Sequence, residues 1–125
     1  MALELLIAVP SGSRFRFDSS LLATLARRIW PEADNVLAGG QVADIVDRYV
    51  HLPTGDLRRC ELAIHRGGDG IGVTAPTEVV AADAVAWICA VSRPPADGEV
   101  VLVNWTHELV PLTPDITSAE LLRLL

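Results

Sequence analysis

Residues 57–75 read LRRCELAIHRGGDGIGVTA, and this stretch decides the fold of the chain. Apolar side chains alternate with others at Cys60, Leu62 and Ile64, the segment GGDG follows, and the alternation resumes at Ile71. Alternation over a short run is typical of a half-buried strand, and Gly and Asp between two such runs are typical of a tight turn. The stretch therefore predicts a β-hairpin. The glycines are expected to form its turn and not a phosphate-binding loop.

A helix is expected directly after this hairpin. Thr77 is placed to cap it, the apolar pattern continues to about Val91, and the prolines at 94–95 prevent its continuation. Apart from Glu78 and Asp83 this segment is apolar all round, so we expect most of its circumference to be covered.

The segment before the hairpin predicts two strands and one helix. Residues 3–9 form a short apolar run that ends at turn-forming residues, and residues 14–17 alternate in the manner of a second short strand. One of the polar residues at 18–20 can cap a helix that ends at Pro31. Residues 32–40 are typical of a loop.

Two interpretations remain open for residues 42–52. Apolar positions recur at helical spacing opposite Asp44 and Asp47, which predicts a short helix with both carboxylates on one face. The β-branched residues of the same segment and the turn signal at 53–56 favour a strand through 49–52.

The last third of the chain predicts a strand, its possible return and a helix. Residues 100–105 are apolar on both alternating faces, as in a central strand, and residues 107–112 either extend this strand or pair with it. A capping box at 117–120 announces a helix that begins after Pro114.

These segments predict a single α+β domain over residues 1–125. We expect a mixed, mainly antiparallel sheet of four to six strands, with about three helices packed mostly on one face, because the hairpin alternates like a half-exposed sheet. Strand order and oligomeric state are left open, and a homo-oligomer is compatible with the sequence.

Composition excludes several functions. All ten basic residues are Arg, so a phosphate loop of the Walker type, a pyridoxal Schiff base and a lysine general base are absent. A net charge of -6 argues against non-specific nucleic-acid binding and suits a basic protein partner. The longest apolar run, residues 84–91, is too short to span a membrane, and no secretory signal is recognised. We therefore expect a cytoplasmic protein, and Cys60 and Cys89 as reduced structural thiols.

Catalytic and metal motifs are incomplete. No two of the three histidines stand at ligand spacing, and the pair His107-Glu108 lacks the second histidine of a metalloprotease motif because Pro111 occupies its position. We expect no metal and no cofactor. The alternative hypothesis is a small enzyme or small-molecule binder whose pocket uses His65, His107 and Glu108, with Asn104 as a further polar group.

The favoured hypothesis is a non-enzymatic protein–protein interaction module. Asp44 and Asp47 would form an acidic face for a basic partner, and Trp30 and Trp105 are placed at edges where they can anchor it. Such a protein would act as an inhibitor, an antitoxin-like or immunity-type protein, or a subunit of a larger assembly. Charge reversal at both aspartates is expected to slow association with the partner at low salt.

Overall fold

The computed structural model describes residues 2–54, 59–104 and 106–125. Within these ranges the elements follow in the order β1 (Leu3–Ala8), α1 (Ser19–Ile29), β2 (Asp34–Leu37), the 3-10 helix η1 (Gly40–Asp44), β3 (Val46–Pro53), β4 (Arg59–His65), β5 (Gly70–Ala75), α2 (Glu78–Ser92), β6 (Val101–Val103), β7 (Leu109–Pro111) and α3 (Ser118–Leu124).

The strands in the described part of the chain form one seven-stranded sheet in the order β2-β3-β4-β5-β1-β6-β7. Every neighbouring pair is antiparallel. The α+β class is confirmed, whereas the expected mixture of directions and the count of four to six strands were wrong. The additional strand is the four-residue edge strand β2, whose sequence DNVL lies in the segment expected to be a loop.

The predicted hairpin is confirmed as β4 and β5. Its register pairs Leu62 with Val73 and Ile64 with Ile71, and all four side chains are buried on the inner face. The turn between the strands holds Gly67 and Gly68 at φ angles of 84° and 76°, a conformation that favours glycine.

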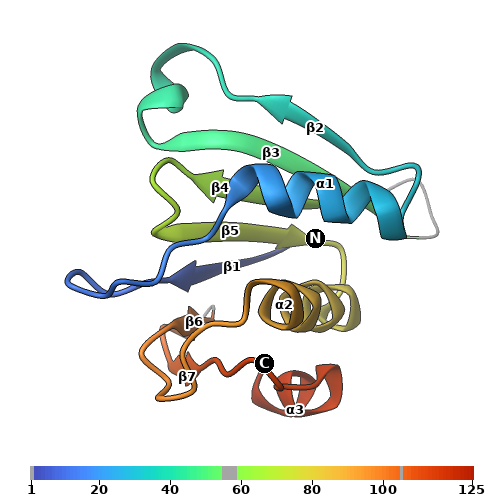
Figure 1. Cartoon of the computed structure of the whole chain (residues 1–125). Coiled ribbons are helices and arrows are strands. Elements are labelled where there is room, and N and C mark those ends of the chain that lie inside the picture. Colours follow the sequence, from blue (N-terminus) through green and yellow to red (C-terminus); the bar gives the residue numbers. More distant parts are fainter. Residues whose placement is uncertain (1, 55–58, 105) are drawn as a thin grey trace.

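The helices lie on one side of the sheet. Figure 1 shows α1 and α2 on the same face, with α3 packed beside α2. The core fills the space between sheet and helices, and its fully buried side chains include Ile7, Leu62 and Ile71 from the strands and Val85 and Ile88 from α2. The apolar circumference of α2 is thus explained, because the sheet, α1 and α3 contact it from different sides.

The helix ends follow the predicted caps. Asp18 accepts a hydrogen bond from the Leu21 N–H of α1 at 3.0 Å, and Thr77 accepts one from the Val80 N–H of α2 at 3.2 Å. Thr117 accepts the corresponding bond from the Glu120 N–H of α3 at 3.1 Å, which is one half of the expected capping box.

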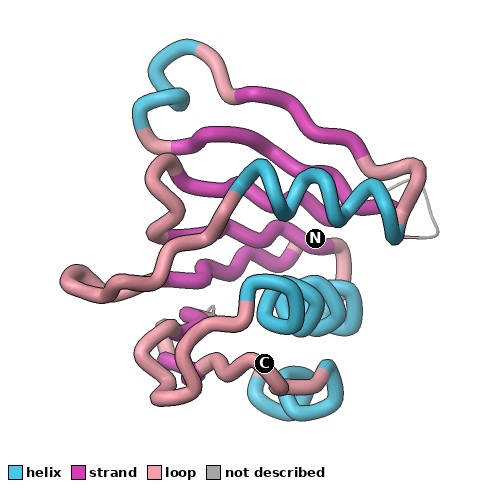
Figure 2. Tube along the Cα trace, in the orientation of Figure 1, coloured by secondary structure: helices cyan, strands magenta, loops and turns pink. Residues whose placement is uncertain are grey.

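The predicted strand at residues 14–17 is absent from the described structure, in which this segment is a loop (Figure 2). Phe17 is nevertheless buried, and its ring meets that of Phe15 edge-on with centroids 4.9 Å apart. The Phe17 N–H donates to the Gly68 carbonyl at 2.8 Å. The alternating phenylalanines therefore cover an end of the core without pairing to a strand.

The strand expected through residues 49–52 is confirmed as part of β3. The helical part is limited to the single 3-10 turn η1, and β3 begins at Val46, with a register irregularity between Val46 and Arg48. The expected helical face that would carry Asp44 and Asp47 together was wrong, because Asp44 ends η1 and Asp47 lies in β3.

The C-terminal expectations hold in outline. Residues 101–103 form β6, residues 109–111 return as β7, and α3 follows with Leu121 fully buried. The strand was expected to extend to Trp105, a residue that lies outside the described ranges.

Candidate interaction surface

One face of the sheet carries none of the described helices (Figure 1). Side chains alternate along each strand, so every strand that contributes to the core also presents side chains to this open face. In β1, for example, Leu5 and Ile7 are buried under the helices while Glu4 and Leu6 point outward and are exposed.

A continuous row of aliphatic, aromatic or small residues crosses the open face. The strand registers place its seven members next to one another, one from each strand. We call this set the apolar row, and in the order of the sheet it comprises Val36, Tyr49, Ala63, Gly72, Leu6, Val103 and Leu109.

The apolar row is accessible from one edge of the sheet to the other. Val36 and Leu109 at its ends are 54% and 64% exposed, and Leu6 near its centre is 37% exposed. Seven strands about 4.8 Å apart make the row roughly 29 Å long. A standard protein interface buries about 800 Å² on each partner, a patch roughly 28 Å across, so the row spans the width of such an interface.

A second row of outward side chains runs beside the first, and we call it the polar row. The registers align its five members across β2, β3, β4, β5 and β1. They are Asp34, His51, Glu61, Thr74 and Glu4.

Hydrogen bonds connect the polar row at its β2 end. Nδ1 of His51 lies 2.7 Å from Oδ1 of Asp34, and Nε2 lies 3.3 Å from Oε2 of Glu61. Nη1 of Arg59 donates to the other carboxylate oxygen of Asp34 at 2.5 Å. Hydrogen bonds from His51 and then Arg59 lower the pKa of the Asp34 carboxyl below its usual value.

The open face therefore carries a small acidic excess beside its apolar row, because Arg59 already pairs with Asp34. The outward positions of the described strands hold the three carboxylates of the polar row and a single arginine, Arg59. Glu4 also borders a shallow hollow of about 330 Å³, which Leu6, Val103 and His107 help to line. The hollow gives the apolar row a depression where β1 and β6 pair.

The two aspartates expected to bind a partner are placed differently. Asp44 is exposed at the end of η1. Asp47 accepts a hydrogen bond from the Ser19 hydroxyl at 2.6 Å and forms ion pairs with Arg48 and Arg66 at 3.3 and 3.5 Å. The Ser19 bond and then Arg48 lower the pKa of Asp47. The carboxylate of Asp47 thus joins α1 to β3, and its charge is already matched within the chain.

Of the two tryptophans expected at edges of the fold, the structure describes only Trp30. Trp30 follows α1, is partly buried, and meets Trp87 edge-on with ring centroids 5.2 Å apart. It also lines a cavity between the helices and the sheet. Trp105 lies outside the described residues.

The groups of the alternative catalytic hypothesis are not brought together. His65 lines a polar groove of about 530 Å³ with Arg48 and Arg66, whereas His107 lines the hollow at the opposite end of the strands. Glu108 is exposed beside His107.

Asn104 has a structural task in the turn that carries His107. Its side-chain oxygen accepts hydrogen bonds from the Thr106 N–H at 3.0 Å, the Thr106 hydroxyl at 2.6 Å and the Glu108 N–H at 3.1 Å. This buried amide therefore stabilises the β6–β7 connection, in which His107 adopts a φ of 64°.

Both cysteines are free and buried, as expected. Burial raises the pKa of Cys60 and of Cys89 to about 12, so neither thiol is ionised near neutral pH. Among the residues that the structure describes, no group of three His, Cys, Asp or Glu side chains is arranged to hold a metal ion.

Comparison of the chain with protein-family models, curated proteins and solved structures finds no significant match. None of the described helices has the length and apolar character needed to cross a bilayer. The function must therefore be argued from the surfaces themselves.

Sequence reasoning missed the open face as a site. The outward residues of β4 and β1 were visible in the sequence as the residues that alternate with the apolar core positions. Their alignment into rows could not be predicted, because it depends on which strands are neighbours in the sheet. Val36 and Leu109 gave the least signal, because their strands are four and three residues long.

Proposed function

We propose that this protein is a non-enzymatic interaction module that binds a basic protein through the open face of its sheet. The observation that carries the proposal is the apolar row, which crosses all seven described strands without a charged residue. Exposed apolar surface of this extent is characteristic of protein interfaces.

The carboxylates beside the apolar row support a basic partner. The polar row lies directly beside it, and the whole chain carries a net charge of -6. Carboxylates at the border of an apolar patch steer a basic partner and raise its association rate at low salt. An inhibitor or immunity-type protein, or a subunit of a larger assembly, uses a surface of this kind.

The test compares two alanine variants. Leu6→Ala removes a side chain near the centre of the apolar row, and Leu21→Ala removes an equally exposed leucine from α1, at 37% and 45% exposure respectively. The tagged chain is captured from its own source at low salt, the bound protein is identified by native mass spectrometry, and its affinity for each variant is measured. We expect Leu6→Ala to weaken binding at least tenfold, about 1.4 kcal/mol, and Leu21→Ala to change it less than twofold.

Two further measurements complete the test. Leu109→Ala lies on an edge strand, so it tests the same face with little effect on the sheet, and it should weaken binding as well. The association rate should fall as salt is raised. A bound protein that is acidic, or that tolerates Leu6→Ala and Leu109→Ala as well as Leu21→Ala, would refute the proposal.

A further inference from the structure

A cavity of about 180 Å³ lies where β3 ends and β4 begins, between the sheet and the two larger helices. Its walls include Trp30 after α1, Leu52 and Pro53 of β3, and Val80 of α2, so they are largely apolar. Asp83 of α2 is the acidic residue among its described lining residues. This cavity is separate from the hollow on the open face.

The size of the cavity limits what it can hold. Pockets for drug-sized molecules and cofactors measure about 300–1,000 Å³. At about 180 Å³ the cavity has room for a single long side chain.

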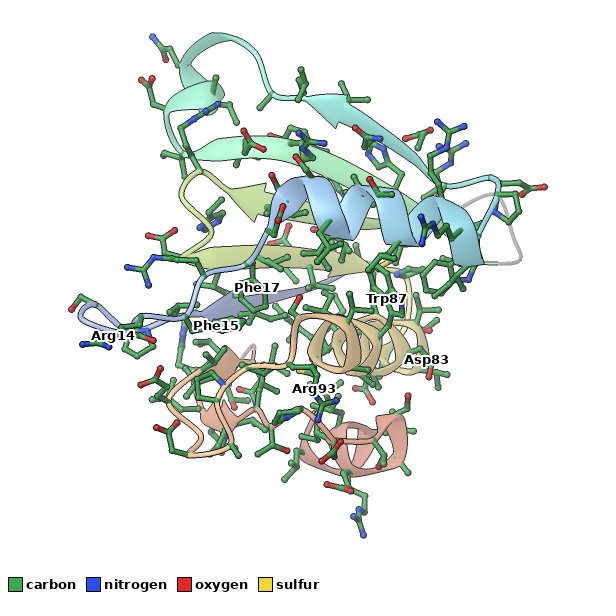
Figure 3. The ribbon with its side chains drawn as sticks, viewed as in Figure 1. Arg14, Phe15, Phe17, Asp83, Trp87 and Arg93 are labelled. Carbon is green, nitrogen blue, oxygen red and sulfur yellow. The ribbon has the colours of Figure 1, made fainter. Side chains whose placement is uncertain are left out.

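Asp83 and Trp30 determine the chemistry of that side chain. Asp83 is exposed while lining the cavity, so its carboxylate stands between cavity and solvent, and it has no ion pair or hydrogen bond from its side chain to any described residue. Figure 3 shows Asp83 at the flank of α2, with Trp87 on the side of the helix toward α1. An aromatic face attracts a cation within about 6 Å.

We propose that the cavity receives a lysine or arginine side chain of the protein partner. The aliphatic stem lies against the apolar walls, and the terminal ammonium or guanidinium reaches the carboxylate of Asp83. Lysine and arginine combine these properties, since each buries its stem while keeping its charged end near water. A neutral side chain of the same length would fill the cavity and leave Asp83 without a partner.

The cavity and the acidic part of the open face lie on opposite faces of the sheet, at the same end of β3. His51 of the polar row and Leu52 of the cavity wall are adjacent in β3 and point to opposite faces of the sheet. A partner that wraps around this end of β3 contacts both. The inference rests on the proposed function for the identity of the ligand as part of a basic protein, but its own site and variants are different.

The test uses two capped tripeptides that differ in one group, acetyl-Gly-Lys-Gly-amide and the same peptide with norleucine in place of lysine. Binding is followed by the indole N–H signals of Trp30 and Trp87 in ¹⁵N–¹H NMR spectra, which are assigned with Trp→Phe variants. The Trp87 N–H is buried without a hydrogen-bond acceptor among the described residues, and its ring contacts Trp30, so it reports on the cavity wall. We expect millimolar binding of the lysine peptide, about fivefold tighter than the norleucine peptide, the strength of an exposed ion pair.

Matched variants assign the difference to one carboxylate. Asp83→Asn should remove the preference for lysine, whereas Asp44→Asn makes the same change of charge on η1 and should preserve it. Equal binding of the two peptides, a preference that survives Asp83→Asn, or the absence of shifts at 20 mM peptide would overturn the inference. Tighter binding of free n-butylammonium than of the lysine peptide would also overturn it, in favour of a small amine. None of these results depends on Leu6. They can therefore be distinguished from a result that refutes partner binding at the open face.

Discussion

The close contact between the β4–β5 turn and the loop before α1 allows a sharp prediction about two adjacent glycines. Both Gly67 and Gly68 have positive φ angles, so an alanine at either position is strained by about 1–2 kcal/mol. The lower entropy of the unfolded alanine variant offsets about 0.4–1 kcal/mol of this strain. The positions differ in space: a Cβ at Gly67 meets nothing within 4 Å, whereas a Cβ at Gly68 would lie 2.2 Å from the Phe17 carbonyl oxygen.

The expected losses follow from this difference. Gly67→Ala should lower the free energy of unfolding by about 1 kcal/mol, which is the net backbone strain. Gly68→Ala must also displace backbone atoms and break the 2.8 Å hydrogen bond from the Phe17 N–H, so we expect a loss of about 3 kcal/mol or more.

Urea unfolding followed by far-ultraviolet circular dichroism measures both losses. With a slope of about 1.5 kcal/mol per molar urea, the midpoint should fall by about 0.7 M for Gly67→Ala and by about 2 M for Gly68→Ala. Equal midpoints for the two variants with unchanged slopes would refute the reasoning, because it would mean that the contact with Phe17 does not constrain position 68.

Two further predictions concern ionisable groups. Burial raises the pKa of Cys60 and Cys89 to about 12, so neither thiol of the native protein should react with a disulfide reagent within minutes at pH 8. Both thiols should react in denaturant, and rapid reaction without denaturant would contradict their burial. The lowered pKa of Asp34 means that its ionised form stabilises the fold above the carboxyl's unfolded pKa and that this contribution is lost as pH falls through the folded value. Asp34 is about half exposed, so Asp34→Asn should reduce stability at pH 7 by about 0.2–1 kcal/mol and by less at pH 2. Thermal unfolding at both pH values measures the two differences. Equal differences would contradict the stabilisation of the Asp34 carboxylate by the hydrogen bonds from His51 and Arg59.

The two proposed contact regions use different parts of the fold. The apolar row depends on the outward side chains of the strands, and the cavity depends on the inward side of β3 together with α1 and α2. A partner that engages both contacts the cavity where β3 ends and β4 begins, and the hydrogen bonds of the polar row lie at the same end of these strands. The variants Leu6→Ala and Asp83→Asn therefore examine the two sides of the sheet.

The sequence by itself determined the elements whose signals are local. The β4–β5 hairpin was predictable because its alternating residues and its glycines lie within 19 consecutive positions, residues 57–75. The three helices were predictable from helical spacing or capping residues, and Asp18, Thr77 and Thr117 cap them as expected. These signals survive folding because helix caps and tight turns are completed by neighbours a few residues away.

Only the tertiary structure decided the edges of the sheet and the surface that it presents. Asp34–Leu37 becomes a strand because β3 supplies its backbone partners, while Phe15 and Phe17 alternate without finding a strand to pair with. The apolar row joins residues from Leu6 to Leu109, and β1 connects its two parts by pairing with both β5 and β6. Such neighbours are set by strand order, which depends on burying the whole core at once and has no counterpart in short-range spacing.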